Sequence, residues 1–275
     1  MAIKDIVVHL DTGEAGPSVS GFAISLAAAT DAHLTAAGIA IQYMPTGGME
    51  EMGCMEYLLE ITDASRQAAE KAYQNLTTAA PAGVQTEFVL IETYSANARD
   101  RFGALARHFD LSVVGRGDWE TVEEERLMAA GALFGSGRPV FLVPATHKAP
   151  ANLARAMICW DGGLTAARAL AGAMPLLARA KRVDVVTIAK EGETADDLPS
   201  FNIVRHLARH GIHAKLSRLP MADDAGAALL RHAASSSADY MVMGAYGHWR
   251  VRELMLGGVT KTVLASMTLP VLMAH

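Results

Sequence analysis

The stretch that decides the fold is Asp239-Tyr240-Met241-Val242-Met243-Gly244-Ala245-Tyr246-Gly247, followed after nine residues by Gly257-Gly258-Val259-Thr260. The apolar run Tyr240–Gly244 is typical of a buried strand, and the pattern over Val259–Ser266 is typical of a helix. A glycine-rich turn between a strand and the start of a helix leaves backbone N–H groups unpaired and pointing outward. The stretch therefore predicts a strand–turn–helix unit of an α/β fold, with a place where a phosphate would be attracted.

The glycines of this turn have two interpretations. A side chain at Gly244, Gly247 or Gly257 would block the close approach of backbone to phosphate, and turns often require a positive φ. Strand-to-helix connections are glycine-rich in any α/β fold, however. The spacing by itself leaves the functional and the structural interpretation open.

The chain repeats its own landmarks. Three segments of the first half recur in the second: Ile6–Asp11 as Ala156–Asp161, Asp110–Gly115 as Asp239–Gly244, and Arg138–Val143 as Leu269–Ala274. Such self-similarity indicates two copies of one architecture. We predict domains at 1–147 and 152–275, joined by a linker over Lys148–Asn152.

Between the landmarks, short apolar runs alternate with longer segments of helical period, which indicates repeated βα units around a parallel sheet. The expected helices are Ser18–Thr30, Ala64–Ala79, Ala96–His108, Thr165–Ala180, Pro199–His210 and Asp224–Ser235. The expected strands include His33–Ile41, Gln85–Ile91, Leu111–Gly115, Arg182–Ala189 and His213–Arg218.

The first half carries a surplus of residues. Asp11 and Asp161 lie 150 positions apart, whereas Gly115 and Gly244 lie 129 apart, so about twenty residues are extra. They fall near 42–62, where turn residues precede a methionine-rich segment. A surface insertion and a lid or partner-binding loop both fit this composition.

The Gly-x2-Gly-x9-Gly pattern at Gly244, Gly247 and Gly257, with a strand that ends in Asp161 and the terminal strand Leu269–Leu272, resembles the nucleotide-binding universal stress protein family. The resemblance covers almost the whole chain as two copies and is stronger in the second half. It implies two tandem doubly wound domains of Rossmann-like or flavodoxin-like type, each with a five-stranded parallel sheet. It also implies an ATP site at the carboxyl ends of the strands, in agreement with the rule for open α/β sheets.

The resemblance also implies individual binding residues. The family's aspartate after the first strand lies by the adenosine, a residue of the second strand covers the base, and the glycine loop holds the phosphates. The matching positions are Asp161, Ile188, Met243, Gly244, Gly247, Gly257, Gly258, Val259 and Thr260. The implied cofactor is ATP, with or without Mg²⁺, and neither a structural metal nor a catalytic residue is expected. Gly258 departs from the family's nucleotide binders, which carry serine or threonine there, so a hydroxyl is lost.

The first half departs further from this pattern. Gly115-Arg116-Gly117 is followed by Asp118-Trp119-Glu120 and Glu123-Glu124-Glu125, and no glycine pair stands near Arg126-Leu127. Carboxylates in this position would repel phosphate. We expect the first domain to be a structural partner whose nucleotide loop is degenerate.

Histidines offer two further candidates. His206, His210 and His213 have a spacing compatible with a metal site. Gly211 also marks a helix C-terminus, where the helix dipole favours histidine. His9, two residues before the first aspartate, is read either as an acid–base group or as a buried histidine without catalytic duty.

Composition narrows the class of protein. Hydrophobic residues make up 51% and charged residues 19% of the 275 positions, as in a packed globular protein. A net charge of −5 gives no general attraction to nucleic acid, and no apolar run reaches the roughly 18–20 residues that a membrane span requires. The chain has two cysteines and its N-terminus lacks the features of a signal peptide, so we expect a cytoplasmic protein.

The leading hypothesis is a cytosolic stress-response protein that binds ATP or another adenine nucleotide in its second domain. The alternatives are an interaction or structural stress protein without nucleotide, and a weak ATP-hydrolysing enzyme, for which no residues that would position a water stand out. We also expect the two domains to pair as an intrachain pseudo-dimer, because the last strands Val140–Val143 and Val271–Ala274 would otherwise be apolar sheet edges. Further homo-oligomers remain open.

Overall fold

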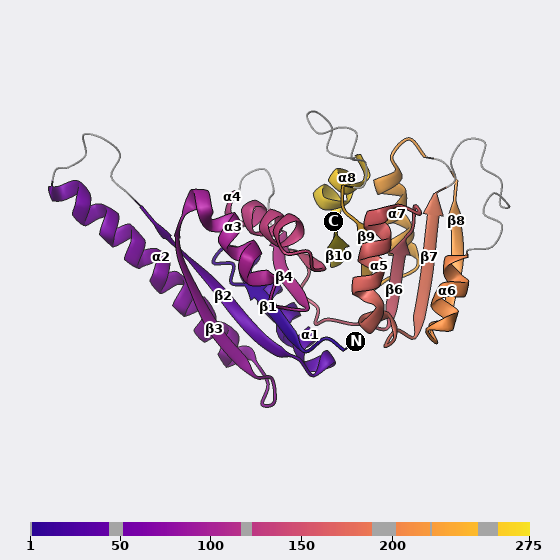
Figure 1. Ribbon diagram of the computed structural model, residues 1–275, viewed down its shortest axis with the longest axis horizontal. Coiled ribbons are helices and arrows are strands. Elements are labelled where there is room, and N and C mark those ends of the chain that lie inside the picture. Colours follow the sequence, from indigo (N-terminus) through magenta and orange to yellow (C-terminus); the bar gives the residue numbers. More distant parts are fainter. Residues whose placement is uncertain (1, 44–51, 117–122, 189–201, 221, 247–257) are drawn as a thin grey trace. The chain divides into compact units, whose positions relative to one another are not determined.

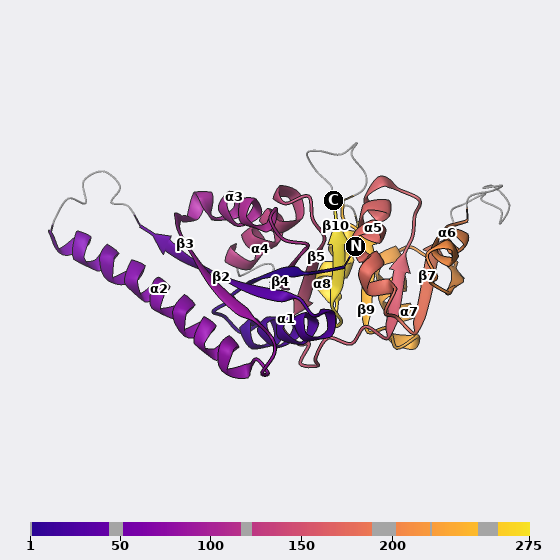
Figure 2. The same cartoon turned by 60° about the horizontal axis from the view of Figure 1, so that its bottom comes forward.

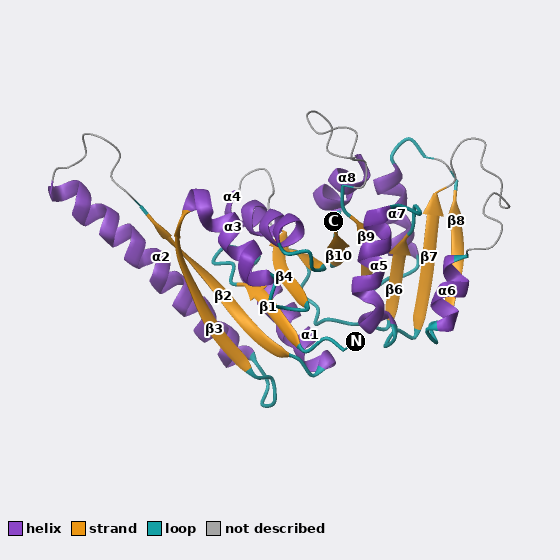
Figure 3. Ribbon diagram, viewed as in Figure 1, coloured by secondary structure: helices purple, strands orange, loops and turns teal. Residues whose placement is uncertain are grey.

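The computed structural model describes residues 2–43, 52–116, 123–188, 202–220, 222–246 and 258–275. The chain divides into two compact units, an N-terminal unit over Ala2–Ala151 and a C-terminal unit over Asn152–His275. Within each unit strands and helices alternate along the chain (Figure 1, Figure 3). None of the helices in the described ranges is long and apolar enough to cross a membrane.

The N-terminal unit is a doubly wound α/β domain. Its elements are β1 (Asp5–His9), α1 (Gly16–Thr30), β2 (His33–Gln42), α2 (Met52–Ala79), β3 (Thr86–Tyr94), α3 (Ser95–Ala106), β4 (Leu111–Arg116), α4 (Glu123–Ala130), a π-helical turn η1 (Gly131–Gly135) and β5 (Val140–Pro144). The strands pair in parallel in the order β3-β2-β1-β4-β5. Helices α1 and α2 cover one face of the sheet, and α3 and α4 cover the other (Figure 2).

The C-terminal unit repeats this topology. Its elements are β6 (Arg155–Cys159), α5 (Leu164–Leu177), β7 (Arg182–Ile188), α6 (Ile203–Arg209), β8 (Ala214–Leu219), α7 (Ala225–Ser235), β9 (Tyr240–Gly244), α8 (Gly258–Ser266) and β10 (Val271–Ala274). The strands pair in parallel in the order β8-β7-β6-β9-β10. The predicted fold, a five-stranded parallel sheet in each half, is therefore confirmed, and the order of connection reverses between β6 and β9.

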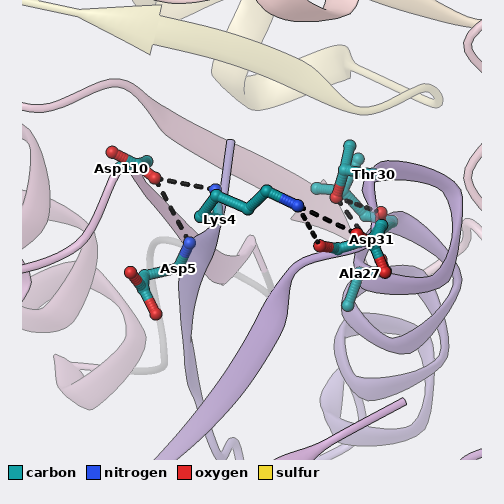
Figure 4. A network of polar contacts seen from close by, with 7 residues as sticks. Lys4, Asp5, Ala27, Thr30, Asp31 and Asp110 are labelled. Carbon is teal, nitrogen blue, oxygen red and sulfur yellow. Dashed lines mark hydrogen bonds and ion pairs between the residues drawn. The ribbon is translucent and has the colours of Figure 1, made fainter. Parts of the chain in front are cut away.

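Equivalent aspartates tie the first strand of each unit to its neighbour. Asp110, just before β4, accepts hydrogen bonds from the backbone N–H groups of Lys4 at 2.8 Å and Asp5 at 3.2 Å (Figure 4). Asp239, just before β9, accepts from the backbone N–H of Arg155 at 2.8 Å and from its guanidinium at 2.8 Å. The two aspartates begin the same recurring sequence segment, so the repeat in the sequence is also a repeated contact.

Two elements differ from the sequence prediction. The helix expected over Ala64–Ala79 begins at Met52, so the later part of the predicted insertion 42–62 is helical, while 44–51 lie outside the described residues. In α2 the apolar period continues upstream through Leu58. Acidic side chains suit the first turn of a helix, since they complement its dipole, and the carboxylate run at Glu123–Glu125, which we read as part of a degenerate loop, forms the first turn of α4. The other predicted elements are present, with ends that shift by a few residues.

Candidate functional site

The candidate site lies at the carboxyl ends of neighbouring strands in the C-terminal unit. Asp161 follows β6, Ile188 ends β7, and Met243 and Gly244 end β9. Strand β6 pairs with β7 on one side and with β9 on the other, so these strand ends lie next to one another. In open parallel sheets, ligands bind at this edge where the strand order reverses.

Asp161 presents an accessible carboxylate at this edge. The side chain is exposed, and its Oδ1 accepts a hydrogen bond from the backbone N–H of Gly163 at 2.8 Å. That bond fixes the carboxylate beside the start of α5. Burial, together with the Asp161 charge, raises the pKa of the Cys159 thiol to about 12, so this cysteine stays protonated and unreactive near neutral pH.

Gly244 is required by packing as well as by its place in the loop. A Cβ built on it would lie 2.5 Å from the backbone nitrogen of Ala166 and 2.5 Å from Thr165 Oγ1. Both contacts belong to the first turn of α5. The end of β9 therefore approaches α5 as closely as a glycine allows. Met243, the residue before it, is buried in the core at 4% exposure.

The start of α8 offers an uncrowded helix N-terminus. Gly258 begins the helix, and a Cβ built on it would meet no atom of the described residues within 4 Å. Its φ does not lie in the left-handed region, and the first turn contains no acidic residue. Val259 is half-buried and Thr260 buried. The predicted loop glycines Gly247 and Gly257 lie outside the described residues.

Thr260 and Tyr246 link this helix start to the segment after β9. The backbone N–H of Tyr246 points at Thr260 Oγ1 over 3.4 Å. Tyr246 has a φ of 55°, a left-handed conformation that is unusual for a bulky residue and concentrates at functional sites. Burial raises the pKa of its phenol. Sequence patterns carry no signal for this backbone conformation at a tyrosine, so it could not be anticipated.

The equivalent place in the N-terminal unit is built differently. Asp11 is only 8% exposed; its Oδ1 accepts from the backbone N–H of Gly13 at 2.6 Å, and its Oδ2 lies 3.0 Å from where a Cβ at Gly115 would stand. Helix α4 begins with glutamates, and Glu124 Oε1 lies 3.4 Å from His9 Nε2. Residues 117–122 lie outside the described residues, so the degenerate nucleotide loop of this unit stays a prediction.

The histidines singled out in the sequence make contacts with other rings. The rings of His206 and His210 meet edge to face with centroids 4.8 Å apart. Across the described residues, no group of three or more histidine, cysteine, aspartate or glutamate side chains could hold a metal ion. His9 is 1% exposed, and its ring packs edge to face against Phe102.

A polar trio that the sequence analysis missed lies inside the C-terminal unit. Asp184 on β7 is 5% exposed and accepts a hydrogen bond from Ser217 Oγ on β8 at 2.7 Å. His232 Nε2 on α7 lies 2.8 Å from the other carboxylate oxygen. The carboxylate stands between hydroxyl and imidazole, so the trio lacks the hydroxyl-to-imidazole bond of a nucleophilic triad. An aspartate inside an otherwise apolar strand was the available signal.

Comparisons with known proteins agree with this description. Residues 189–275 match the model of the Universal stress protein family, and a search of curated proteins gave no match. A universal stress protein from Archaeoglobus fulgidus DSM 4304 has 14% sequence identity and a TM-score of 0.72, with 98% of this chain and 97% of the other covered. A functionally unknown protein from Pseudomonas aeruginosa PAO1 has 13% identity and a TM-score of 0.61, with 99% and 92% covered.

A universal stress protein from Archaeoglobus fulgidus in complex with dAMP matches over 52% of this chain and 98% of its own, with 17% identity and a TM-score of 0.29. The two longer matches share the fold of the whole chain. The chain thus has the fold of a tandem universal stress protein, and residues 189–275 are similar in sequence to the Universal stress protein family.

Proposed function

We propose that the C-terminal unit binds an adenine nucleotide, with ATP as the foremost ligand, at the carboxyl ends of β6, β7 and β9. The observation that supports this best is the start of α8, where none of the described residues crowds Gly258 and no acidic residue stands in the first turn. Unpaired backbone N–H groups and the helix dipole attract a phosphate to such a place. The loop glycines, Gly244, Gly247 and Gly257, would then hold the phosphate chain.

The adenosine would lie over the neighbouring strand ends. Asp161 offers an exposed carboxylate to a ribose hydroxyl or an amine, and the half-buried Ile188 offers an apolar surface to the base. Val259 and Thr260 complete the first turn of α8 beside the phosphates. We propose that Mg²⁺, where present, enters with the triphosphate.

The protein that results is a nucleotide-binding stress protein of the cytoplasm, which senses or stores the nucleotide. The described residues of the site include no group that would position a water against the phosphate, as a dedicated ATPase requires. A module that binds no nucleotide is the second candidate, because Gly258 lacks the family's hydroxyl. Chromatography of the denatured, freshly purified protein separates the two, since only a nucleotide binder releases adenine nucleotide.

Asp161→Ala should weaken ATP binding by about 1–3 kcal/mol, the usual cost of losing a charge-assisted hydrogen bond with the partner left unpaired. Calorimetric titration of the full chain measures this, and one ATP per chain is expected. Asp100→Ala, at an exposed aspartate of the N-terminal unit, is the matched control and should bind like the wild type. Equal affinity in all three proteins, or two ATP per chain, would contradict the assignment.

Gly258→Ser should tighten ATP binding by about 1 kcal/mol, since it adds one hydroxyl donor at a position where a Cβ meets no neighbour within 4 Å in the described part of the chain. The φ of this residue is one that serine adopts without strain. Gly258→Ala supplies the same Cβ without the hydroxyl and should show no gain. The idea fails if the serine variant binds no better than the alanine variant in the same titration.

We also propose that the two units pair as a pseudo-dimer through their last strands. Each is the last strand of its unit, where β5 pairs with β4 and β10 pairs with β9. Both are apolar, so the other side of each strand would be an exposed edge unless it is covered. Residues 152–275 expressed alone should therefore form a homodimer or precipitate. Light scattering after gel filtration decides, and a soluble, stable monomer would refute the pairing.

A further inference from the structure

Helix α2 runs past the end of the sheet that it covers. The backbone N–H of Ile41 donates to Ser65 Oγ at 3.1 Å, which sets Ser65 level with the last residues of β2. The helix begins at Met52, so about 13 residues, or about 20 Å at 1.5 Å per residue, extend beyond the sheet (Figure 1, Figure 2). We call the part Met55–Ala64 the α2 overhang.

The apolar stripe of α2 continues into the overhang. Ala69 and Leu76 are buried against the sheet, and Met55 and Thr62 continue their seven-residue spacing, which keeps side chains on nearly one helix face. Leu58 lies on the same side. Of residues 55–64 none is buried. In the described part of the chain, the stripe that stabilises the rest of the helix therefore has no strand under it here.

The apolar side chains at this end of the unit are unusually accessible. Met55 is 45%, Tyr57 61% and Leu59 60% exposed. Tyr43 and Tyr94, at the adjacent ends of β2 and β3, are 47% and 40% exposed. These five are most of the large hydrophobic side chains that stand exposed in the described chain. Met55 and Leu59, four residues apart, share one face of the helix. Exposed apolar side chains that gather on one face mark an interaction surface, and a helix segment this short gains most of its stability from packing.

The charged side chains beside the apolar stripe of the overhang are all negative. Glu56, Glu60 and Asp63 lie on the polar side of the overhang, and no basic residue occurs from 55 to 65. The first cation, Arg66, already pairs with Glu92 at 2.7 Å and lies 3.5 Å from Asp63. An occupant of the stripe would therefore meet an apolar strip bordered by carboxylates.

The negative charge of the overhang disfavours two occupants of the stripe, a second copy of the overhang and the preceding segment of the same chain. A second copy of the overhang would bring carboxylates against carboxylates, which is destabilising. The preceding segment 44–51 contains two glutamates and no basic residue, so it also adds negative charge. We propose that the α2 overhang is a docking site for a basic amphipathic helix of a partner protein, whose apolar face packs on Met55 and Leu59 while lysines or arginines pair with Glu56 and Glu60. This proposal stands apart from nucleotide binding.

The test uses the full chain and a synthetic amphipathic helix made of leucine and lysine, labelled with fluorescein and followed by anisotropy. A peptide of the same pattern in which glutamate replaces lysine measures the charge requirement. We expect the lysine peptide to bind and the glutamate peptide not to bind. Met55→Gln/Leu59→Gln should lower the affinity by about tenfold or more, since apolar anchors dominate such interfaces.

Ala68→Gln/Asn75→Gln is the matched control, because both positions are exposed on the same helix outside the overhang. It should bind the peptide like the wild type, with circular dichroism confirming that both variants fold. Equal affinity of the two double variants would overturn the docking site, since attraction would then be due to net charge alone. Gel filtration that shows a dimer broken by Met55→Gln/Leu59→Gln would also overturn it, in favour of a second copy as the occupant.

Discussion

Gly244→Ala is expected to lower the free energy of unfolding of the C-terminal unit by about 3 kcal/mol, at the upper end of the usual cost of overpacking. The added methyl would stand 2.5 Å from the backbone nitrogen of Ala166 and 2.5 Å from Thr165 Oγ1. Backbone cannot yield like the end of a flexible side chain, so β9 and α5 must separate. Urea denaturation followed by circular dichroism measures the loss.

Gly258→Ala is the control for this experiment, because the same methyl there meets nothing within 4 Å among the residues that the structure describes. Alanine has a higher helix propensity than glycine by about 1 kcal/mol in a helix interior, so no loss of stability is expected at the first residue of α8. Gly244→Ala should also weaken nucleotide binding, because the displaced strand end carries the loop. Two variants of equal stability would show that the close approach at Gly244 is unimportant.

Asp184→Ala should cost about 3 kcal/mol of stability, since one buried carboxylate serves two partners. Its removal leaves the Ser217 hydroxyl, at 2.7 Å in the native protein, and His232 Nε2, at 2.8 Å, without their acceptor. Ser217→Ala removes only one of these bonds and should cost about 1 kcal/mol. Thermal and urea unfolding of both variants give the comparison, and equal losses would refute the central role of the carboxylate.

The loss of Asp184 should also reach the candidate site. His232 holds α7 to the sheet, and α7 packs tightly on α8: a Cβ at Gly226 would lie 2.6 Å from Thr262 Cβ, and Thr262 Oγ1 donates to Asp224 Oδ2 at 3.3 Å. A loosened α7 would therefore loosen α8, whose start we propose as the phosphate site. Nucleotide affinity in Asp184→Ala should fall further than in Ser217→Ala.

Local patterns in the chain were sufficient for the architecture. The recurring segments predict two units of one topology, and the alternation of apolar runs with helical period predicts a parallel sheet in each. The aspartates Asp110 and Asp239 mark the same position in both copies, and both bind the start of the first strand. The place of the candidate site was also predictable, because Gly244 and the start of α8 follow from the strand–turn–helix pattern.

Only the tertiary structure decided which of these features are accessible and which side chains meet. Asp11 and Asp161 occupy equivalent positions in the sequence repeat, yet the first is buried and the second exposed, because burial depends on what the neighbouring loop and helices place over a residue. Asp184 meets Ser217 and His232 through strand register and helix packing, which join residues far apart in the chain. The overhang of α2 likewise depends on where the sheet beneath it ends. Periodicity is a property of consecutive residues, whereas exposure and pairing are set by segments that the sequence does not bring together.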